Sequence, residues 1–322
     1  MRGSSLWRKL PTMSYRINVR NFSGFARAAG TWGLGMGLGL GLGWAGCQSP
    51  ESEPLAELPF VTRPVPADPQ RPGNAEAGYH TLVNAPYISC GIPYSVFSQV
   101  YGTVPPADRL PGRDGNNANL PYYLTWLRAP SGVELVTTNC LACHASKING
   151  QLVVGLGNAS SDFTDDGAAQ AQAIGLFVKD PQERQEWQRW ADRITDIAPY
   201  IQATTIGVNG ADNLTAAILT HRDRKTLAWS AQPLLDPPPV AFIPVDVPPW
   251  WRMSKKNAMF YNASGRGDHA RIMMTASTLC TDTVAEATAI DALFPDVRAY
   301  VAALQPPVYP FPVDQPRATR GK

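Results

Sequence analysis

The chain has 322 residues, with 28 Lys and Arg against 26 Asp and Glu and a formal net charge of +2. Six of the basic residues lie in the first 46 positions, which contain no acidic residue; removing those six from the 28 leaves 22 basic against 26 acidic residues, a net charge of −4. The basic excess therefore belongs to a leader segment, and we expect no nucleic-acid partner.

Residues 1–46 have the order of a secretory signal, in which basic residues precede an apolar stretch and then small residues. The stretch ends in Trp44-Ala45-Gly46-Cys47, which resembles the end of a bacterial lipoprotein signal. We predict lipidation of Cys47, with a stray thiol beside an ordinary cleavage site as the alternative. The chain would then face the bacterial periplasm from a lipid anchor in the membrane, and Gln48, where some inner-membrane lipoproteins carry aspartate, favours the outer membrane.

Seven prolines in residues 48–73 predict an extended tether over 47–73. Asn74 is a predicted N-cap for a helix over 75–83. Residues 84–120 are expected to be loop, because Gly and Pro turn signals recur in them. Residues 149–163 are expected to be irregular or to form a short strand.

The run Cys140-Leu141-Ala142-Cys143-His144 has the form C-x-x-C-H, which is the attachment signature of c-type haem. The two thiols can bond to the vinyl groups of one porphyrin, and the adjacent histidine can bind its iron. A redox dithiol and half of a zinc site are the alternatives for C-x-x-C. A zinc site would need a second ligand pair, and the other cysteines are isolated in the sequence. We therefore predict one covalent haem c, held by Cys140, Cys143 and His144.

Further along the chain, Asp180 and Pro181 are a predicted helix start, and apolar residues follow at helical spacing. Helices are expected over 166–177, 181–201, 211–221, 268–279 and 283–304, the last interrupted at Pro295. Residues 230–251 are expected to form a proline-rich loop. The predicted fold is mostly α: a cytochrome c-like helical domain over 74–305, enlarged by long Pro-rich loops and followed by a linker or tail over 306–322.

Cys90 and Cys280 remain after the lipid and haem assignments. Leftover thiols in an oxidising compartment tend to pair, so we predict a Cys90–Cys280 disulfide. Two buried free thiols are the alternative.

Over about residues 74–322 the chain resembles the di-haem cytochrome c peroxidase-like family, which includes relatives that oxygenate polymers. The haem motif carries the resemblance, together with Tyr87-Ile88-Ser89-Cys90-Gly91-Ile92-Pro93, the run Pro-Pro-Trp-Trp-Arg-Met-Ser-Lys-Lys-Asn at 248–257, and Gly265-Arg266-Gly267-Asp268. The resemblance implies a second haem domain, yet the chain has one C-x-x-C-H. The segment 306–315 resembles the linker between two haem domains. We therefore expect a truncated or split reading frame, with a complete mono-haem protein as the alternative.

The second axial ligand of the iron would decide between electron transfer and peroxide or dioxygen chemistry. We predict Met274 for this position, followed by Met273 and His269, although methionines at helical spacing more often pack in a core. His221 is expected at a helix end that faces water.

Basic and aromatic residues near the second matching run are expected to support the cofactor. Arg252, Lys255 and Arg266 could bind the haem propionates, with a solvated loop as the alternative. Trp250 and Trp251 could wall the porphyrin, with ordinary core packing as the alternative.

Together these features favour a periplasm-facing c-type cytochrome that transfers electrons and is the electron-entry half of a peroxidase-like di-haem system. Its partner would be a redox protein or a second haem domain. One alternative is a peroxidase or oxygenase whose own haem is the reactive centre; another is a truncated, non-catalytic haem-binding fragment. The sequence favours an electron-transfer protein over a complete peroxidase and assigns no catalytic residue.

Overall fold

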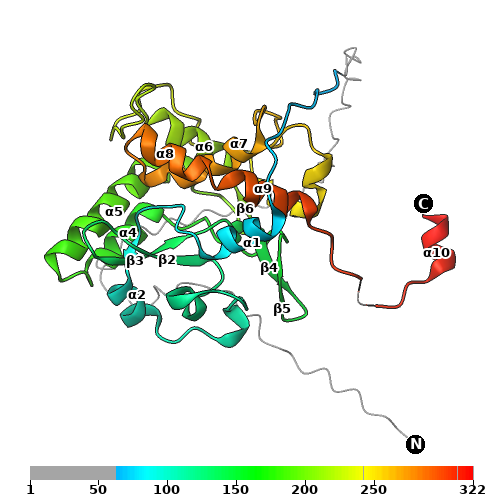
Figure 1. The fold of residues 1–322 in the computed structure, drawn as a ribbon, viewed down its shortest axis with the longest axis horizontal. Helices are drawn as coiled ribbons and strands as arrows, with labels where there is room; N and C mark the ends of the chain where they lie inside the picture. Colours follow the sequence, from blue (N-terminus) through cyan, green and yellow to red (C-terminus); the bar gives the residue numbers. More distant parts are fainter. Residues whose placement is uncertain (1–62, 242, 310, 322) are drawn as a thin grey trace, which may run out of the picture. The chain divides into compact units, whose positions relative to one another are not determined.

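The computed structural model describes residues 63–241, 243–309 and 311–321 (Figure 1). One compact unit, Pro66–Lys322, contains nearly all of them. The predicted signal segment, the lipidation residue Cys47 and most of the tether lie outside the described residues.

The fold is mixed, with 44 % of the described residues in helices and 11 % in strands of small antiparallel sheets. The prediction of a mostly α, cytochrome c-like fold is therefore wrong. Strand β2 (Leu124–Arg128) pairs along its whole length with β3 (Glu134–Thr138), and β1 (Ile92–Pro93) pairs with the other edge of β3. Gly132, at φ 87°, closes the β2–β3 turn by donating its amide to the Ala129 carbonyl at 2.8 Å. The sheet forms by pairing between separate segments of the chain, and the residue periodicity within one segment does not reveal such pairing.

A second hairpin follows the C-x-x-C-H run directly. Strands β4 (Ala145–Ile148) and β5 (Gln151–Val154) are joined by Asn149 and Gly150, which have φ values of 50° and 77°. Asn-Gly with both residues at positive φ is the signature of a tight two-residue hairpin turn. Residues 149–163 were expected to be irregular or to form a short strand, and β5 is such a strand; the Asn-Gly pair was the overlooked signal for the hairpin turn. The remaining strands, β6 (Val208–Asn209) and β7 (Val245–Asp246), pair with each other.

Helices with local start signals lie where the sequence predicts them. The Asn74 side chain accepts a hydrogen bond from the Ala77 amide at the start of α1, and Asp180 accepts from two amides at the start of α5. The α-helices are α1 (Ala75–Asn84), α2 (Tyr94–Tyr101), α3 (Leu141–His144), α4 (Gly167–Gly175), α5 (Pro181–Ile201), α6 (Ala211–Thr220), α7 (His269–Met274), α8 (Val284–Asp291), α9 (Phe294–Ala303) and α10 (Gln315–Arg320). The 3₁₀ helices are η2 (Pro106–Asp108), η3 (Gly115–Asn119), η4 (Trp250–Lys255) and η5 (Thr275–Cys280).

The expectation for residues 84–120 was wrong: this predicted loop contains α2 and two 3₁₀ helices. The predicted helix 283–304 is interrupted, as expected, into α8 and α9, but the break lies at 292–293, so that Pro295 is in the first turn of α9. Proline is favoured in a first turn because its missing N–H would have no partner there in any case.

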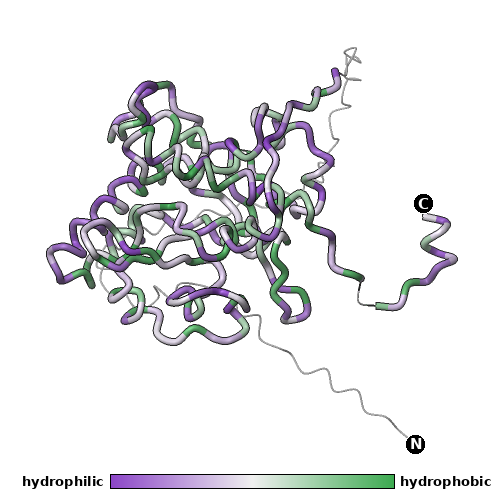
Figure 2. The backbone as a smooth tube through the Cα atoms, viewed as in Figure 1, coloured by the Kyte–Doolittle hydropathy of each residue, from purple (hydrophilic) through white to green (hydrophobic). Residues whose placement is uncertain are grey.

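The main core lies where α1 packs against α9, two helices that neighbour each other in Figure 1. Gly78 allows this close approach, because a Cβ at that position would lie 1.9 Å from the Asp296 carbonyl oxygen. Leu82 of α1 and Phe294 of α9 are completely buried. Figure 2, coloured by hydropathy, shows hydrophobic residues on these packed elements and on β5.

The end of the predicted tether contacts the folded unit. The Gln70 side chain donates to the Gly267 carbonyl and accepts from the His269 amide, each at 2.9 Å. Arg71 pairs with Asp291 at 2.7 Å. These bonds hold the chain against the start of α7 before α1 begins.

Cys90 and Cys280 form a disulfide with their Cα atoms 5.7 Å apart and 190 positions between them in the sequence. Both residues are completely buried. The bond joins the segment before β1 to the end of η5 and encloses the C-x-x-C-H run in its covalent loop.

Replacing both cysteines by alanine should lower the free energy of unfolding by about 3–5 kcal/mol, because the unfolded chain gains the entropy of a long open loop. Urea denaturation with and without dithiothreitol measures the effect. Reductant should destabilise the wild type and leave the Cys90→Ala/Cys280→Ala variant unchanged. Equal stability of the two proteins without reductant would contradict the prediction.

Candidate functional site

The C-x-x-C-H run forms α3, a single helical turn that is too short to be stable alone. The Asn139 side chain holds the start of this turn. Its oxygen accepts a hydrogen bond from the Leu141 amide at 2.9 Å, and its Nδ2 donates to the Tyr122 carbonyl at 3.0 Å. Asn158 holds its end: its backbone amide donates to the Cys143 carbonyl at 2.9 Å, and its side chain donates to the Ala142 carbonyl at 3.1 Å. Neither asparagine was among the predicted site residues, although an Asn at a helix start is a readable capping signal.

Tyr87 positions the first cysteine of the motif, Cys140, through a hydrogen bond. Its hydroxyl accepts a hydrogen bond from the Cys140 amide at 3.0 Å and donates to the Leu82 carbonyl at 3.3 Å. The ring is buried and meets Phe294 edge-to-face, with centroids 5.7 Å apart. Burial raises the pKa of the Tyr87 phenol well above its usual value, so the hydroxyl keeps its proton and can donate.

The His144 imidazole stacks on the Trp250 indole, with ring centroids 4.7 Å apart and planes 25° from parallel. Gly155 connects the two residues, donating its amide to the His144 carbonyl and accepting from the Trp250 amide, each at 2.8 Å. Burial, together with the charge of Lys256, lowers the pKa of His144 to about 4. The imidazole is therefore neutral at neutral pH. Its Nδ1 is buried and has no hydrogen-bond partner in the described part of the chain.

Cys140 and Cys143 are free thiols in the structure. Burial raises the pKa of both, that of Cys143 to about 12 with a further contribution from Cys140. A reactive dithiol needs a thiolate at neutral pH, so these values argue against a redox dithiol. Across residues 63–241, 243–309 and 311–321, no group of three or more His, Cys, Asp or Glu side chains is placed so that it could hold a metal ion.

Apolar side chains surround this turn. Leu141, Trp250 and Met274 belong to one buried cluster, and Cys140, Met273 and other partly buried residues pack against it. Two free thiols at the right spacing, a neutral imidazole with an unpaired nitrogen and an apolar surround are the groups that covalent haem attachment requires. The residues present therefore fit haem c.

The other predicted site residues divide into two groups. Met274 and Trp250 are buried in the cluster, and Trp251 is half-buried. The predicted propionate ligands Arg252, Lys255 and Arg266 are all exposed, and the structure records no salt bridge for any of them within the described residues.

Two further histidines are buried. His269, a candidate second axial ligand, is 3 % exposed, and its Nε2 has no partner among the residues described. His221 is 1 % exposed and stacks on Trp229, with centroids 5.0 Å apart. The expectation that His221 faces water was wrong, because the proline-rich loop after α6 folds back over it: its Nδ1 lies 2.7 Å from the Ser230 carbonyl oxygen.

No protein-family model, curated protein or solved structure matches this chain. The resemblance to the di-haem family therefore depends on the residue runs alone. Within the described ranges, no helix combines the length and the apolar character needed to cross a membrane.

Replacing Tyr87 by phenylalanine should lower the free energy of unfolding by about 1–3 kcal/mol, because the Cys140 amide loses its acceptor in a buried place. Urea denaturation of the apoprotein measures this. Tyr101→Phe is the matched control, since Tyr101 is 36 % exposed and should change stability by less than about 0.5 kcal/mol. Equal effects of the two substitutions would show that the Tyr87 hydroxyl does not support the turn.

Proposed function

We propose that this chain is a c-type haem protein that transfers electrons in the bacterial periplasm. The observation that carries the proposal is the α3 turn itself, where two free thiols and a buried neutral imidazole with an unpaired nitrogen follow the C-x-x-C-H spacing. The leader supports export, and Cys47 supports a lipid anchor, in the outer membrane by the absence of aspartate at position 48.

When bound, haem c supplies one-electron iron chemistry, and the chain provides its attachment and surroundings. Cys140 and Cys143 would hold the porphyrin, and His144 would bind the iron from one face. Trp250 packs against the imidazole and fixes its plane. The residues that hydrogen-bond to the α3 turn, Asn139 among them, hold its backbone in position.

The second axial position is the part of the proposal that separates electron transfer from oxygen chemistry. We favour Met274, because it lies in the same buried cluster as Trp250 and Leu141 and a thioether ligand suits electron transfer. By its resemblance to the di-haem peroxidase-like family, the chain would be the electron-entry half of a larger system that includes a second haem domain or a redox partner protein.

Haem attachment is tested by intact mass and absorption spectra of the exported chain, produced in a host that assembles c-type cytochromes. The wild type should gain the mass of one haem. The Cys140→Ala/Cys143→Ala variant should gain none, because no thiol remains to bond the porphyrin. The Cys90→Ala/Cys280→Ala variant controls for the loss of two cysteines and should keep its haem. A wild-type chain that is exported without covalent haem would overturn the proposal.

Met274→Ala should convert a low-spin, six-coordinate ferrous spectrum into a high-spin one, because the iron loses its second strong ligand. Leu152→Ala is the control, since that side chain packs against the same cluster but has no atom that binds iron, so its loss should leave the spectrum unchanged. An unchanged Met274→Ala spectrum would exclude this ligand, and Met273→Ala and His269→Ala would then be tested. A high-spin, peroxide-responsive wild type would instead favour a haem that is itself the reactive centre.

A further inference from the structure

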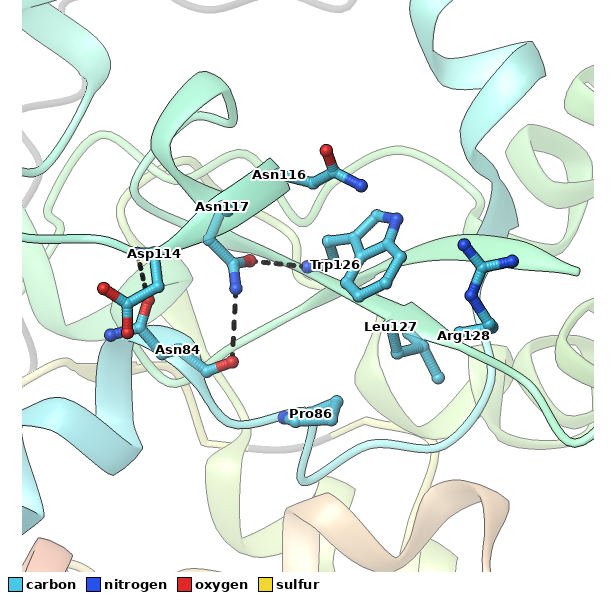
Figure 3. A pocket seen from close by; sticks show the side chains of 9 residues that line it. Asn84, Pro86, Asp114, Asn116, Asn117, Trp126, Leu127 and Arg128 are labelled. Atoms are coloured by element: carbon cyan, nitrogen blue, oxygen red, sulfur yellow. Dashed lines mark hydrogen bonds between the residues drawn. The ribbon is translucent and has the colours of Figure 1, made fainter. Parts of the chain in front are cut away.

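A cavity of about 340 Å³ opens where the end of α1, the 3₁₀ helix η3 and strand β2 meet (Figure 3). Its lining does not include Cys140, Cys143 or His144. The residues that matter for its chemistry are Asn84, Pro86, Asp114, Asn116, Trp126 and Arg128.

Hydrogen bonds between these three elements fix the cavity wall. The Asn84 side-chain oxygen accepts from the Asp114 amide at 2.8 Å, and the Asn84 carbonyl accepts from the Asn117 side chain at 3.2 Å. The Asn117 side-chain oxygen in turn accepts from the Trp126 amide at 2.7 Å. Figure 3 shows these bonds as a chain that links Asp114, Asn84, Asn117 and Trp126. A wall fixed in this way binds a ligand with little loss of conformational entropy.

The charged groups of the cavity already have partners. Asp114 pairs with His80 at 2.8 Å, and Arg128 pairs with Glu134 at 2.5 Å. An anion would meet the Asp114 carboxylate, and a cation would meet the Arg128 guanidinium. This balance favours an uncharged ligand.

The uncharged part of the lining combines a flat aromatic surface with amides. Trp126 and Arg128 alternate on β2 and so share one face of the strand. The Arg128 guanidinium carbon lies 5.7 Å from the centroid of the indole ring, and Figure 3 shows both side chains among the lining residues. Asn116 adds an amide group that can both donate and accept. The Asn84 Nδ2 and the Trp126 Nε1 are buried inside the wall without an acceptor in the described segments, so the polar contacts of a ligand would fall to Asn116 and Asp114.

We propose that this cavity binds a neutral saccharide. The apolar C–H face of a pyranose ring would stack on the Trp126 indole, and its hydroxyl groups would exchange hydrogen bonds with the Asn116 amide and the Asp114 carboxylate. The site is separate from the proposed haem function and does not depend on it.

Isothermal titration calorimetry of the full chain with glucose, N-acetylglucosamine and maltose tests the proposal. At least one sugar should bind saturably, with a Kd of about 0.1–10 mM, as expected for a ligand of this size in one small site. Acetate serves as the anionic probe and should not bind in the cavity.

Trp126→Ala should weaken sugar binding about tenfold, because the stacking surface is lost. Asn116→Ala should weaken it about threefold to tenfold by removing one hydrogen-bonding group. Asn119→Ala is the matched control: Asn119 belongs to the same 3₁₀ helix, is exposed and does not line the cavity. If Trp126→Ala does not fold, Asn116→Ala decides. The proposal fails if no sugar binds saturably, if acetate alone binds, or if Asn116→Ala binds sugar as the control does.

Discussion

Gly155 carries the two hydrogen bonds that join the C-x-x-C-H turn to the tryptophan segment. Its amide contacts the His144 carbonyl, and its carbonyl contacts the Trp250 amide. The residue has a φ of 88°, and a Cβ there would lie 2.9 Å from the Leu304 Cδ1 atom and 3.5 Å from the Trp250 Cβ atom. A side chain at this position would therefore strain the backbone and displace the Leu304 side chain. The position of His144, the proposed iron ligand, therefore depends on a residue that has no side chain.

Elsewhere in the molecule, buried arginines supply hydrogen-bond donors to backbone carbonyls. Arg113, Arg193 and Arg222 are 6, 6 and 4 % exposed, and each donates to two or more backbone carbonyls of other segments. Burial lowers the pKa of Arg113 and of Arg222 to about 10, so both remain charged at neutral pH. A chain with 30 prolines leaves many carbonyls without a helix or sheet partner, and one guanidinium offers five donors to them.

The difference between local and long-range interactions explains which features the sequence could predict. Local signals were sufficient where a structure depends on neighbours in the chain: Asn74 and Asp180 cap their helices, and the C-x-x-C-H spacing identifies the thiols and imidazole of the candidate site. The fold class was wrong because β2 and β3 pair through tertiary contacts, and the support for the site escaped notice for the same reason. Tyr87 lies 53 positions from the amide it binds, and no local pattern marks such a partner.

The disulfide has a consequence for how the protein is made. Cys140 and Cys143 lie between Cys90 and Cys280, which are 190 positions apart. If the chain is exported from its N-terminus, as proposed, Cys90 and the motif thiols would emerge long before Cys280. Closing the shorter loop also costs less entropy, so oxidation at this stage would favour the wrong partners. Under the proposed function, haem attachment to Cys140 and Cys143 before oxidation would therefore leave Cys90 and Cys280 to form the pair seen in the structure.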